Sequence, residues 1–368
     1  MRVCHLTSAH PRDDVRIMHK QCRSLANAGF DVVLVVADGK GDEKIDQVKI
    51  LDTGQAGSRS SRMIKGAKNV ASKGAELSAD LYHIHDPELI PWGLWLRRKG
   101  HRVVFDAHEE LPAQIRTKHY LPAGVRGPLA HGIAIGEGLA FPRFSGLVGA
   151  TPRITEILAK RNDHVALVAN YPLADEFHSA DHRSKQDYVL FVGSISRIRG
   201  LAQLVEAMAL VKNEIRLHLV GRAAPDGIES LIEQSPGRAF TEVLGPIPRS
   251  AVATQMRHAL CGIVTFLDAP NHRSSQPNKL FEYMSAGIPV IASNFDYWRT
   301  LIEGEGCGIC VDPANPIEIS GAIDYLAQNK VIAAQMGERG RRAIIKRLNW
   351  ATQADVLTNF YKELGVVP

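Results

Sequence analysis

Residues 277–287 bring together residue types that bind phosphate and hydroxyl groups. They predict a short helix from about Asn278 to Gly287, whose first backbone N–H groups and dipole can hold a phosphate. Lys279 adds a mobile cation beside it. Glu282, one turn later, can accept hydrogen bonds from two vicinal hydroxyls, as a ribose presents. For this stretch alone, a surface helix with a solvated Glu282 is the alternative interpretation.

Residues 191–200 predict a strand that enters a glycine turn, presents two arginines and continues into a helix. The guanidinium groups of Arg197 and Arg199 form bidentate hydrogen bonds, which suit a diphosphate and the charge that grows on a departing one. A loop with solvated arginines is the alternative for this stretch alone. Because the two stretches occupy equivalent strand ends of one predicted domain, their combination favours ligand binding.

Histidine and carboxylate side chains end two strands predicted in the first half of the chain. Residues 81–85 end in His85 and are followed by Asp86, and residues 102–106 are followed by His108 and Glu109. Ligands of open α/β sheets bind beyond the carboxyl ends of the strands. We therefore expect these side chains on the acceptor side of a site. His83 and His85 are expected to alternate faces of the strand without a third ligand, so no metal site is predicted.

The elements that carry these residues alternate between strands and helices, which is typical of an α/β fold with parallel sheets covered on both faces. A helix through Val15, Met18, Cys22 and Leu25 is expected to end at Gly29. The pattern breaks near residues 170–177 and then starts again. Strands are expected at 3–7, 32–37, 81–85, 102–106, 188–192, 216–220, 241–244, 261–266 and 289–292. Two doubly wound domains in tandem, with the ligand between them, are the simplest architecture.

Composition and charge restrict the classes of molecule that the protein is expected to bind. The net charge of +5 is too small for a protein that binds nucleic acid through its phosphates. Residues 1–170 hold 24 basic and 18 acidic residues, so the positive charge lies in the first half and suits an anionic acceptor attached to a membrane. No apolar run is long enough to span a membrane, and His5 and His10 interrupt any signal-like core, so a cytoplasmic location is expected.

Two further stretches have alternative interpretations. Residues 127–144 are rich in Gly, Ala and Pro, and we favour a loosely packed helix over a surface that touches a membrane. The five cysteines are too few and too scattered for a disulfide framework. Cys307 and Cys310 have redox or zinc spacing, but no second pair accompanies them, so structural cysteines are expected.

The motifs of the second half resemble the C-terminal domain of glycosyltransferase family 4 in order and spacing. The resemblance rests there on residues 192–193, 199–200, 217–221, 244–245 and 277–291. It continues over nearly the whole chain through His85-Asp86, residues 106–109, 170–172, Asn349-Trp350 and Tyr361. Residues 11–17 are similar to a subset of bacterial members that build surface polysaccharides.

The resemblance implies the GT-B architecture, in which two Rossmann-like domains face a deep cleft. Residues 1–170 would bind the acceptor, residues 171–348 would bind the nucleotide sugar, and residues 349–368 would form a helix that crosses back to the N-terminal domain. It also implies a retaining transferase without metal or cofactor. The donor would be a nucleotide-diphosphate sugar with UDP as the expected carrier, and the acceptor a glycan or a lipid-linked saccharide at the inner face of the membrane.

The resemblance also implies roles for individual residues. Glu282 would hold the ribose, Arg199 would take the place of the usual Lys at the diphosphate, and His108 would be the active-site histidine near the transferred sugar. The remaining donor contacts would come from Gly193, Ile247, Pro277, Asn278, Lys279 and Leu280. Arg12 or Arg16 could reach the diphosphate, with a charge pair at a helix start as the alternative.

Two positions depart from the family's pattern. Ser194 stands where an arginine is common, and Arg197 is the expected substitute. Ser274 stands where the first of two paired glutamates is expected, so Gln276 or Asn278 would read the sugar hydroxyls. These departures leave open a non-catalytic relative that serves as a partner subunit. A nucleotide-sugar 2-epimerase, which shares the architecture, is a second alternative, although the C-terminal motif looks more like that of a transferase.

Overall fold

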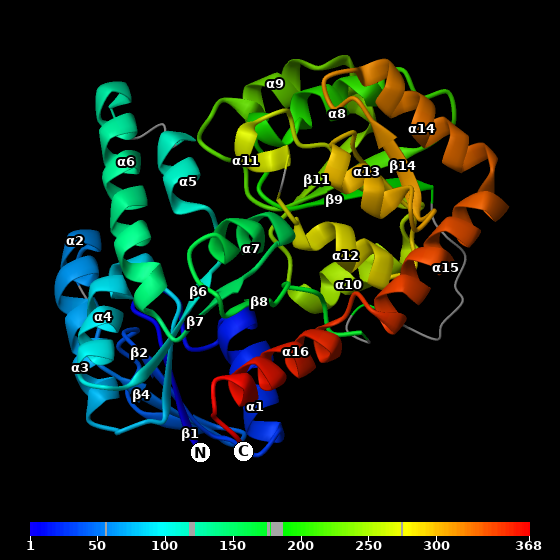
Figure 1. Cartoon of the computed structure of the whole chain (residues 1–368). Helices are drawn as coiled ribbons and strands as arrows, with labels where there is room; N and C mark the ends of the chain where they lie inside the picture. Colours follow the sequence, from blue (N-terminus) through cyan, green and yellow to red (C-terminus); the bar gives the residue numbers. More distant parts are fainter. Residues whose placement is uncertain (56, 118–121, 175–176, 178–186, 274) are drawn as a thin grey trace. The chain divides into compact units, whose positions relative to one another are not determined.

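The computed structural model describes residues 1–55, 57–117, 122–174, 177, 187–273 and 275–368. It divides into two compact units (Figure 1). The first unit consists of Met1–Asn170 together with Trp350–Pro368, and the second is Tyr171–Asn349. Each unit contains a sheet of mainly parallel strands with helices on both faces, as expected from the alternating sequence pattern.

The sheet of the first unit has the strand order β3-β4-β2-β1-β5-β6-β7-β8, in which the short β3 is antiparallel to β4 and the other pairs are parallel. Its strands are β1 Arg2–Leu6, β2 Asp31–Val36, β3 Glu43–Ile45, β4 Val48–Asp52, β5 Leu81–Ile84, β6 Arg102–Ala107, β7 Gly146–Gly149 and β8 Val165–Leu167. Its helices are η1 Val15–Cys22, α1 Arg23–Asn27, α2 Arg59–Ser61, η2 Arg62–Gly66, α3 Ala67–Ala75, η3 Pro87–Leu89, α4 Ile90–Arg98, α5 Leu111–Thr117, α6 Ala123–Ala140, η4 Phe141–Arg143, α7 Pro152–Ala159 and α16 Trp350–Glu363.

Two apolar clusters cover the two faces of this sheet. One contains Met18 and Leu25 from η1 and α1 together with Leu357 and Phe360 from α16, so the C-terminal helix belongs to the core of the first unit. The other contains Val70 of α3 and Phe141 of η4. Because the sheet is buried on both faces, its strands read as nearly continuous apolar runs.

The helix that follows β1 differs from the regular helix that the sequence predicts. Residues Val15–Cys22 form π-helical turns, and Met18 and His19 both donate their backbone N–H to the carbonyl of Asp14. Met18 is fully buried, as expected for the apolar face of this helix. Val15 was expected on the same buried face, but it is 40% exposed, so the prediction is wrong for this residue.

The sheet of the second unit has the strand order β11-β10-β9-β12-β13-β14, and all of its pairs are parallel. Its strands are β9 Tyr188–Val192, β10 Arg216–Val220, β11 Thr241–Gly245, β12 Cys261–Val264, β13 Val290–Ser293 and β14 Gly308–Val311. Its helices are η5 Arg197–Arg199, α8 Leu201–Met208, α9 Ile228–Gln234, η6 Pro236–Phe240, α10 Arg249–His258, α11 Pro270–Arg273, α12 Asn278–Ser285, α13 Asp296–Ile302, α14 Pro316–Gln328 and α15 Lys330–Lys346.

Helix α6 covers the stretch for which a packed helix was favoured over a membrane-facing surface. The helix is present, but the expected packing is wrong for most of its length (Figure 1). Ala130 and Ala140 are its fully buried residues within the part that the structure describes. Its apolar side chains Val125, Leu129, Ile135 and Leu139 are exposed. Within the described ranges, no helix combines the length and apolarity that crossing a bilayer requires.

The cysteines are free thiols, and Cys4, Cys22, Cys261 and Cys307 are buried. Cys307 and Cys310 flank the start of β14 and lie in or against the apolar core of the second unit. Burial raises the pKa of both thiols to about 12, which keeps them protonated and unreactive at neutral pH. This environment agrees with the structural role expected for them.

Candidate functional site

The second unit has a natural ligand position where its strand order reverses. The chain runs from β9 outward through β10 and β11 on one side, and from β12 through β13 and β14 on the other. Ligands of doubly wound sheets bind at this reversal, beyond the carboxyl ends of the two central strands. Gly193 and η5 follow β9 there, and Thr265, Phe266 and α12 follow β12.

Arg199 is the cation at this position. Its guanidinium lies over the ring of Phe266, 5.0 Å from the ring centroid. Burial lowers the pKa of this arginine, and among the described residues no carboxylate pairs with it. A half-buried cation without a paired anion is costly unless a ligand supplies the negative charge. The arrangement is therefore that of an anion site.

Gly193 gives Arg199 the space that it occupies. A Cβ atom at Gly193 would lie 2.5 Å from Nη1 of Arg199, and the backbone of Gly193 has a φ of +154°. Gly200, the next residue in the chain, packs against the loop after β12, since a Cβ there would lie 2.1 Å from the carbonyl oxygen of Thr265. The absence of a side chain at both glycines thus lets this segment pack closely at the site.

The start of α12 supplies the second part of the site. Pro277 is the residue that precedes the helix, and as a proline it offers no side-chain cap to the first N–H groups. Glu282 is 5% exposed and forms an ion pair with Lys279. Its other oxygen lies 3.6 Å from Nη2 of Arg249. A buried carboxylate beside two cations, one turn into a helix, is suited to a ligand that carries both hydroxyl and phosphate groups.

The other residues predicted to contact the donor have different environments. Gln276 donates its amide to the hydroxyl of Tyr297, and Leu280 is fully buried, so only its backbone is available. Arg197 is exposed and donates its backbone N–H to Asp226 at 2.8 Å. Ser194 and Asn278 are exposed and Ile247 is half-buried, whereas Ser274 lies outside the described residues.

Sequence reasoning missed two residues near this site. Arg249 begins α10 and lies 47% exposed beside Glu282, and its only signal was the helix start that follows Pro248. His272 is buried against the ring of Phe266, with ring centroids 5.0 Å apart, and donates Nδ1–H to the carbonyl of Leu267. Burial and the nearby Arg199 lower the pKa of His272, so this imidazole is neutral at pH 7.

In the first unit, the strand order reverses between β1 and β5, and Asp86 lies at that point. Its carboxylate accepts hydrogen bonds from the hydroxyl of Thr7 and the backbone N–H groups of Ser8 and Ala9. His10 Nδ1 lies 2.9 Å from its second oxygen. Burial opposes the charge of Asp86, yet these donors lower its pKa to about 2. Asp86 is 1% exposed and holds the loop after β1, and the acceptor contact expected of it stays a prediction.

Asp106 is the centre of a second buried cluster. Arg16 donates from Nε and Nη2 to its two oxygens at 3.0 and 2.8 Å, and Gln21 donates at 2.7 Å. His85 Nδ1 and His108 Nε2 lie 3.4 and 3.3 Å from Oδ2 of Asp106. Burial opposes the charge, yet Arg16 and His108 hold the pKa of Asp106 well below its usual range.

The two arginines of the first unit that were considered for a diphosphate form ion pairs within that unit, and their contact with a ligand stays a prediction. Arg16 is buried on Asp106. Arg12 is also buried and binds both oxygens of Asp38, with a further contact to Glu43 at 2.6 Å. Charge pairing within the unit, the alternative interpretation, describes both residues. Glu109 is exposed at the same edge of the sheet.

His83 and His85 lie on the same face of β5, so the alternation expected for them is wrong. Residues two apart on a strand share a face, and the two rings stack with centroids 4.7 Å apart. His5 pairs with His83 across β1 and β5 and stacks on both. His5 is thus the third histidine that the sequence did not reveal, because it lies 78 residues away from His83 in the chain.

Hydrogen bonds join the three histidines and Tyr361 into a buried chain. Nε2 of His85 and Nδ1 of His5 share a hydrogen bond at 2.9 Å, and Nδ1 of His85 faces Asp106 at 3.4 Å outside hydrogen-bond geometry. The hydroxyl of Tyr361 lies 3.4 Å from Nε2 of His5 and 2.5 Å from Nδ1 of His83. Burial lowers the pKa values of all three imidazoles, to about 3 for His85, which keeps the chain neutral.

Two groups of these side chains have the composition of a metal site: His5 with His83 and His85, and His85 with Asp106 and His108. In the first group, the hydrogen bond between His5 and His85 occupies one nitrogen of each ring. In the second, Arg16 already neutralises Asp106. The first group is thus hydrogen-bonded and the second is ion-paired in this structure, and the absence of a metal stays a prediction.

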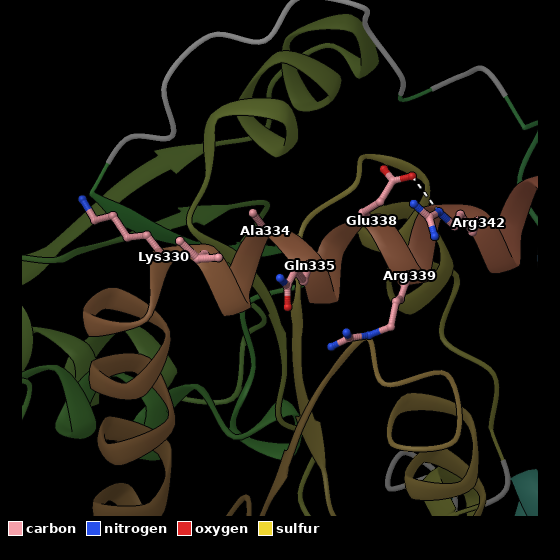
Figure 2. A pocket seen from close by; sticks show the side chains of 7 residues that line it. Lys330, Ala334, Gln335, Glu338, Arg339 and Arg342 are labelled. Atoms are coloured by element: carbon pink, nitrogen blue, oxygen red, sulfur yellow. Dashed lines mark hydrogen bonds and ion pairs between the residues drawn. The ribbon is translucent and has the colours of Figure 1, made fainter.

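A separate hollow of about 680 Å³ lies along α15 and is lined by Lys330, Val331, Ala334, Gln335, Glu338, Arg339 and Arg342 (Figure 2). Glu338 and Arg342 form an ion pair at 3.0 Å, and Arg339 donates to the carbonyl of Gly306. Its charged groups therefore have partners within the unit. It is also apart from the strand ends that carry the predicted site residues.

Two family descriptions match the chain in tandem. "Glycosyl transferase 4-like domain" covers residues 15–170, and "Glycosyl transferases group 1" covers residues 174–343. The chain belongs to glycosyltransferase family 4. The family 4 fold is also found in solved structures. Sucrose-phosphate synthase from Thermosynechococcus elongatus is similar over 99% of both chains, with a TM-score of 0.78 and 18% identity. HepE from Anabaena in complex with UDP covers 99% of this chain and 100% of its own, with a TM-score of 0.72 and 12% identity.

A curated relative matches a smaller part of the chain. D-inositol 3-phosphate glycosyltransferase from Xylanimonas cellulosilytica is 26% identical over 180 residues, which are 48% of this chain and 42% of the relative. The chain thus spans less than half the length of this relative. Within family 4, the likeness to the solved structures establishes the GT-B fold of two Rossmann-like units.

Proposed function

We propose that this family 4 protein is a retaining glycosyltransferase that moves a sugar from a nucleotide-diphosphate donor to a glycan or lipid-linked acceptor in polysaccharide or glycolipid biosynthesis. The observation that carries the proposal is Arg199, a half-buried cation without a paired carboxylate among the described residues, at the strand-order reversal of the second unit. Glu282 at the start of α12 supports it, because a ribose and a diphosphate need a hydroxyl acceptor and a cation together.

In this proposal, the residues of the second unit divide the work of donor binding. Arg199 and the start of α12 offset the diphosphate charge that grows as the sugar leaves. Lys279, which pairs with Glu282 in the free protein, turns to the phosphate and frees Glu282 for the ribose hydroxyls. The leaving phosphate takes the proton of the acceptor hydroxyl on the same face of the sugar. We propose that neither a metal nor a further cofactor takes part.

UDP is proposed as the carrier of the donor sugar. The proposal is supported by HepE, whose structure contains UDP.

The experiment that tests the donor site is a thermal-shift screen with UDP, GDP, ADP, CMP and dTDP, because a ligand that binds the folded state raises apparent stability. A selective shift that Glu282→Gln abolishes and Glu338→Gln retains supports the donor site. Glu338 is an exposed glutamate of the same unit and serves as the matched control.

The screen also separates the alternatives. Sugar transfer or donor hydrolysis with a shifting nucleotide supports a transferase, and interconversion of the donor sugar at its C2 position supports a 2-epimerase. Nucleotide binding without turnover, or no nucleotide binding, supports a non-catalytic partner subunit. The observation that favours this last alternative is Ser194, which is exposed and stands where the family commonly has an arginine.

We propose a peripheral location on the inner face of the cytoplasmic membrane, with the surface of the first unit as the contact. Helix α6 exposes four large apolar side chains, and η2 exposes Met63 and Ile64. Residues 59–73 contain five basic and no acidic residues. Exposed apolar groups combined with basic ones are typical of a surface that binds anionic lipids.

Vesicle flotation tests this location. The protein is expected to float with phosphatidylglycerol vesicles more than with phosphatidylcholine vesicles. A Leu129→Gln/Leu139→Gln variant is expected to lose this binding, whereas Val243→Gln, which changes an exposed apolar residue of the second unit, keeps it. Equal flotation of both variants would exclude α6 as the contact.

A further inference from the structure

Two histidine–carboxylate pairs lie side by side in the first unit. His10 Nδ1 lies 2.9 Å from Oδ1 of Asp86, and His108 Nε2 lies 3.3 Å from Oδ2 of Asp106. The two carboxylates belong to neighbouring strands, because Asp86 follows β5 and Asp106 is in β6. The two imidazole rings are 5.3 Å apart between centroids. Both remain partly open to solvent, at 31% and 24% side-chain exposure, whereas both carboxylates are buried.

The first pair presents a positive donor. Burial opposes a charge on His10, but the hydrogen bond that His10 donates to Asp86 and the nearby carboxylates of Asp14 and Asp106 raise its pKa above 6.5. The other groups that face His10 are the hydroxyl of Thr7, 3.3 Å from Nδ1, and the ring of His108. Because Asp86 engages Nδ1, the remaining N–H of the imidazolium is Nε2, which is free to donate to an oxygen that carries negative charge.

The second pair presents an acceptor. Nε2 of His108 faces the carboxylate of Asp106 at 3.3 Å, outside hydrogen-bond geometry, and the negative charge of this carboxylate favours a proton on Nε2. In the neutral ring, Nδ1 of His108 is then an acceptor for a hydroxyl proton. Arg16 fixes Asp106 from the opposite side through two hydrogen bonds, which keeps this orientation in place.

We propose that His10 and His108 form one subsite, in which His10 binds an anionic phosphate oxygen and His108 accepts a hydrogen bond from a neighbouring hydroxyl. This inference deepens the proposed function and rests on it. The ligand chemistry is a hydroxyl close to a phosphate, as in a sugar phosphate or polyol phosphate. The phosphate could belong to the donor diphosphate or to a phosphorylated acceptor, and the experiment distinguishes these two sources.

The first experiment is an NMR titration of the full chain with histidine rings labelled with ¹³C and ¹⁵N. Glycerol 3-phosphate is expected to shift the signals of His10 and His108 together, inorganic phosphate to shift His10 more than His108, and glycerol to shift neither strongly. A shift of His10 with UDP assigns the phosphate to the donor, and a shift with glycerol 3-phosphate alone assigns it to the acceptor. If no phosphate probe moves the His10 signal, the proposal is overturned.

The second experiment measures turnover of the nucleotide sugar that the thermal-shift screen selects. His10→Gln is expected to lower kcat about 10- to 150-fold, the loss typical of one charge-assisted hydrogen bond. Nucleotide affinity is expected to fall with it if the phosphate belongs to the donor, and to stay unchanged if the phosphate belongs to the acceptor. His164→Gln, an exposed histidine of the same unit, is the matched control and is expected to retain wild-type turnover. Turnover of His10→Gln within twofold of wild type would refute a role for His10.

The pH dependence of activity distinguishes a role of the charged His10 from a purely structural role, which would not shift the profile. If the imidazolium of His10 is required, activity falls as pH rises through its raised pKa. Asp86→Asn removes the partner that raises this pKa, so the alkaline limb should move to lower pH, and an unmoved limb contradicts the proposal. Asp86 also holds the loop after β1, so the titration and His10→Gln keep the test independent of its folding.

The proposed function can fail separately from this inference. A wild-type protein that binds no nucleotide and turns over no donor would contradict the transferase assignment. The glycerol 3-phosphate titration would still show whether His10 and His108 bind a phosphate and a hydroxyl together.

Discussion

Arg16 and Asp106, 90 residues apart in the sequence, form a two-point ion pair that is buried on both sides. The pair joins η1 to β6 beneath the imidazole of His108. It therefore links the stability of the first unit to the orientation of a candidate active-site residue.

Removal of Arg16 should be costly, because it leaves Asp106 charged and buried. Arg16→Met is expected to lower the free energy of unfolding by about 3–5 kcal/mol, the range for a broken buried pair. Urea unfolding measures this difference. The matched control is Arg2→Met, which breaks an exposed pair with Asp31 and should cost at most about 1 kcal/mol. Similar losses in both variants would contradict the special role of the buried pair.

Replacement of Arg199 should weaken binding of the nucleotide diphosphate. Arg199→Met removes the charge and is expected to lower affinity about 10- to 150-fold, and Arg199→Lys should lose less because it keeps the charge but not the planar fork. Isothermal titration calorimetry with the nucleotide found in the screen measures both. Arg216→Met, an exposed arginine at the opposite end of the sheet, is the control. Unchanged affinity in Arg199→Met would remove Arg199 from the site.

Gly193→Ala tests whether the position of Arg199 matters apart from its charge. The added Cβ would lie 2.5 Å from Nη1 of Arg199, so the guanidinium must move, while the charge of the unit is unchanged. We expect weaker nucleotide binding and a free energy of unfolding that falls by about 1 kcal/mol, since φ is positive at this residue. Calorimetry and urea unfolding separate the two effects. Wild-type affinity would mean that Arg199 acts without a fixed position.

The buried histidines should make the protein less stable in acid. Burial lowers the pKa of His85 from 6.5 to about 3, so below pH 6.5 the unfolded chain binds a proton that the folded chain does not. Stability is therefore expected to fall from pH 6.5 toward pH 3, with a limiting slope of about 1.4 kcal/mol per pH unit for each such histidine. Asp86, with its pKa lowered to about 2, adds a further loss as pH falls from about 4 toward 2.

Urea unfolding at a series of pH values between 7.5 and 4.5 measures this slope. His85→Gln keeps a polar side chain of similar reach and cannot titrate, so its slope should be shallower than that of wild type. His164→Gln removes an exposed histidine and should leave the slope unchanged. Equal slopes in wild type and His85→Gln would show that the cluster is not the source of the acid sensitivity.

Local sequence signals were sufficient for the parts of the site that lie within one strand–turn–helix segment. Gly193, Arg199 and Glu282 are examples, because a glycine after a buried strand and a carboxylate one turn into a helix are short-range patterns. The family resemblance added their expected roles. The family and its two-unit parallel-sheet fold are confirmed, whereas the roles of the single residues remain predictions.

Pairing over long sequence distances could not be predicted in the same way. Arg12 was expected near a diphosphate, but Asp38 and Glu43 lie beside it once β2 and β3 have formed. His5 was not connected with His83 and His85 because their proximity depends on the pairing of β1 with β5. Arg16 and His85, which lie beside Asp106, likewise come from different elements, η1 and the end of β5. Such contacts follow from the strand order, which no single sequence segment contains.

The C-terminal helix α16 places a constraint on the order in which the protein is completed during synthesis. Tyr361 and Phe360 are buried in the first unit, and Tyr361 bonds to the histidine chain beneath its sheet. Residues 1–170 leave the ribosome before the second unit, yet their core stays incomplete until residues 350–363 emerge. The second unit, Tyr171–Asn349, contains its whole core within one continuous segment and can fold before then. Of these two units, the one whose translation begins first is thus completed second.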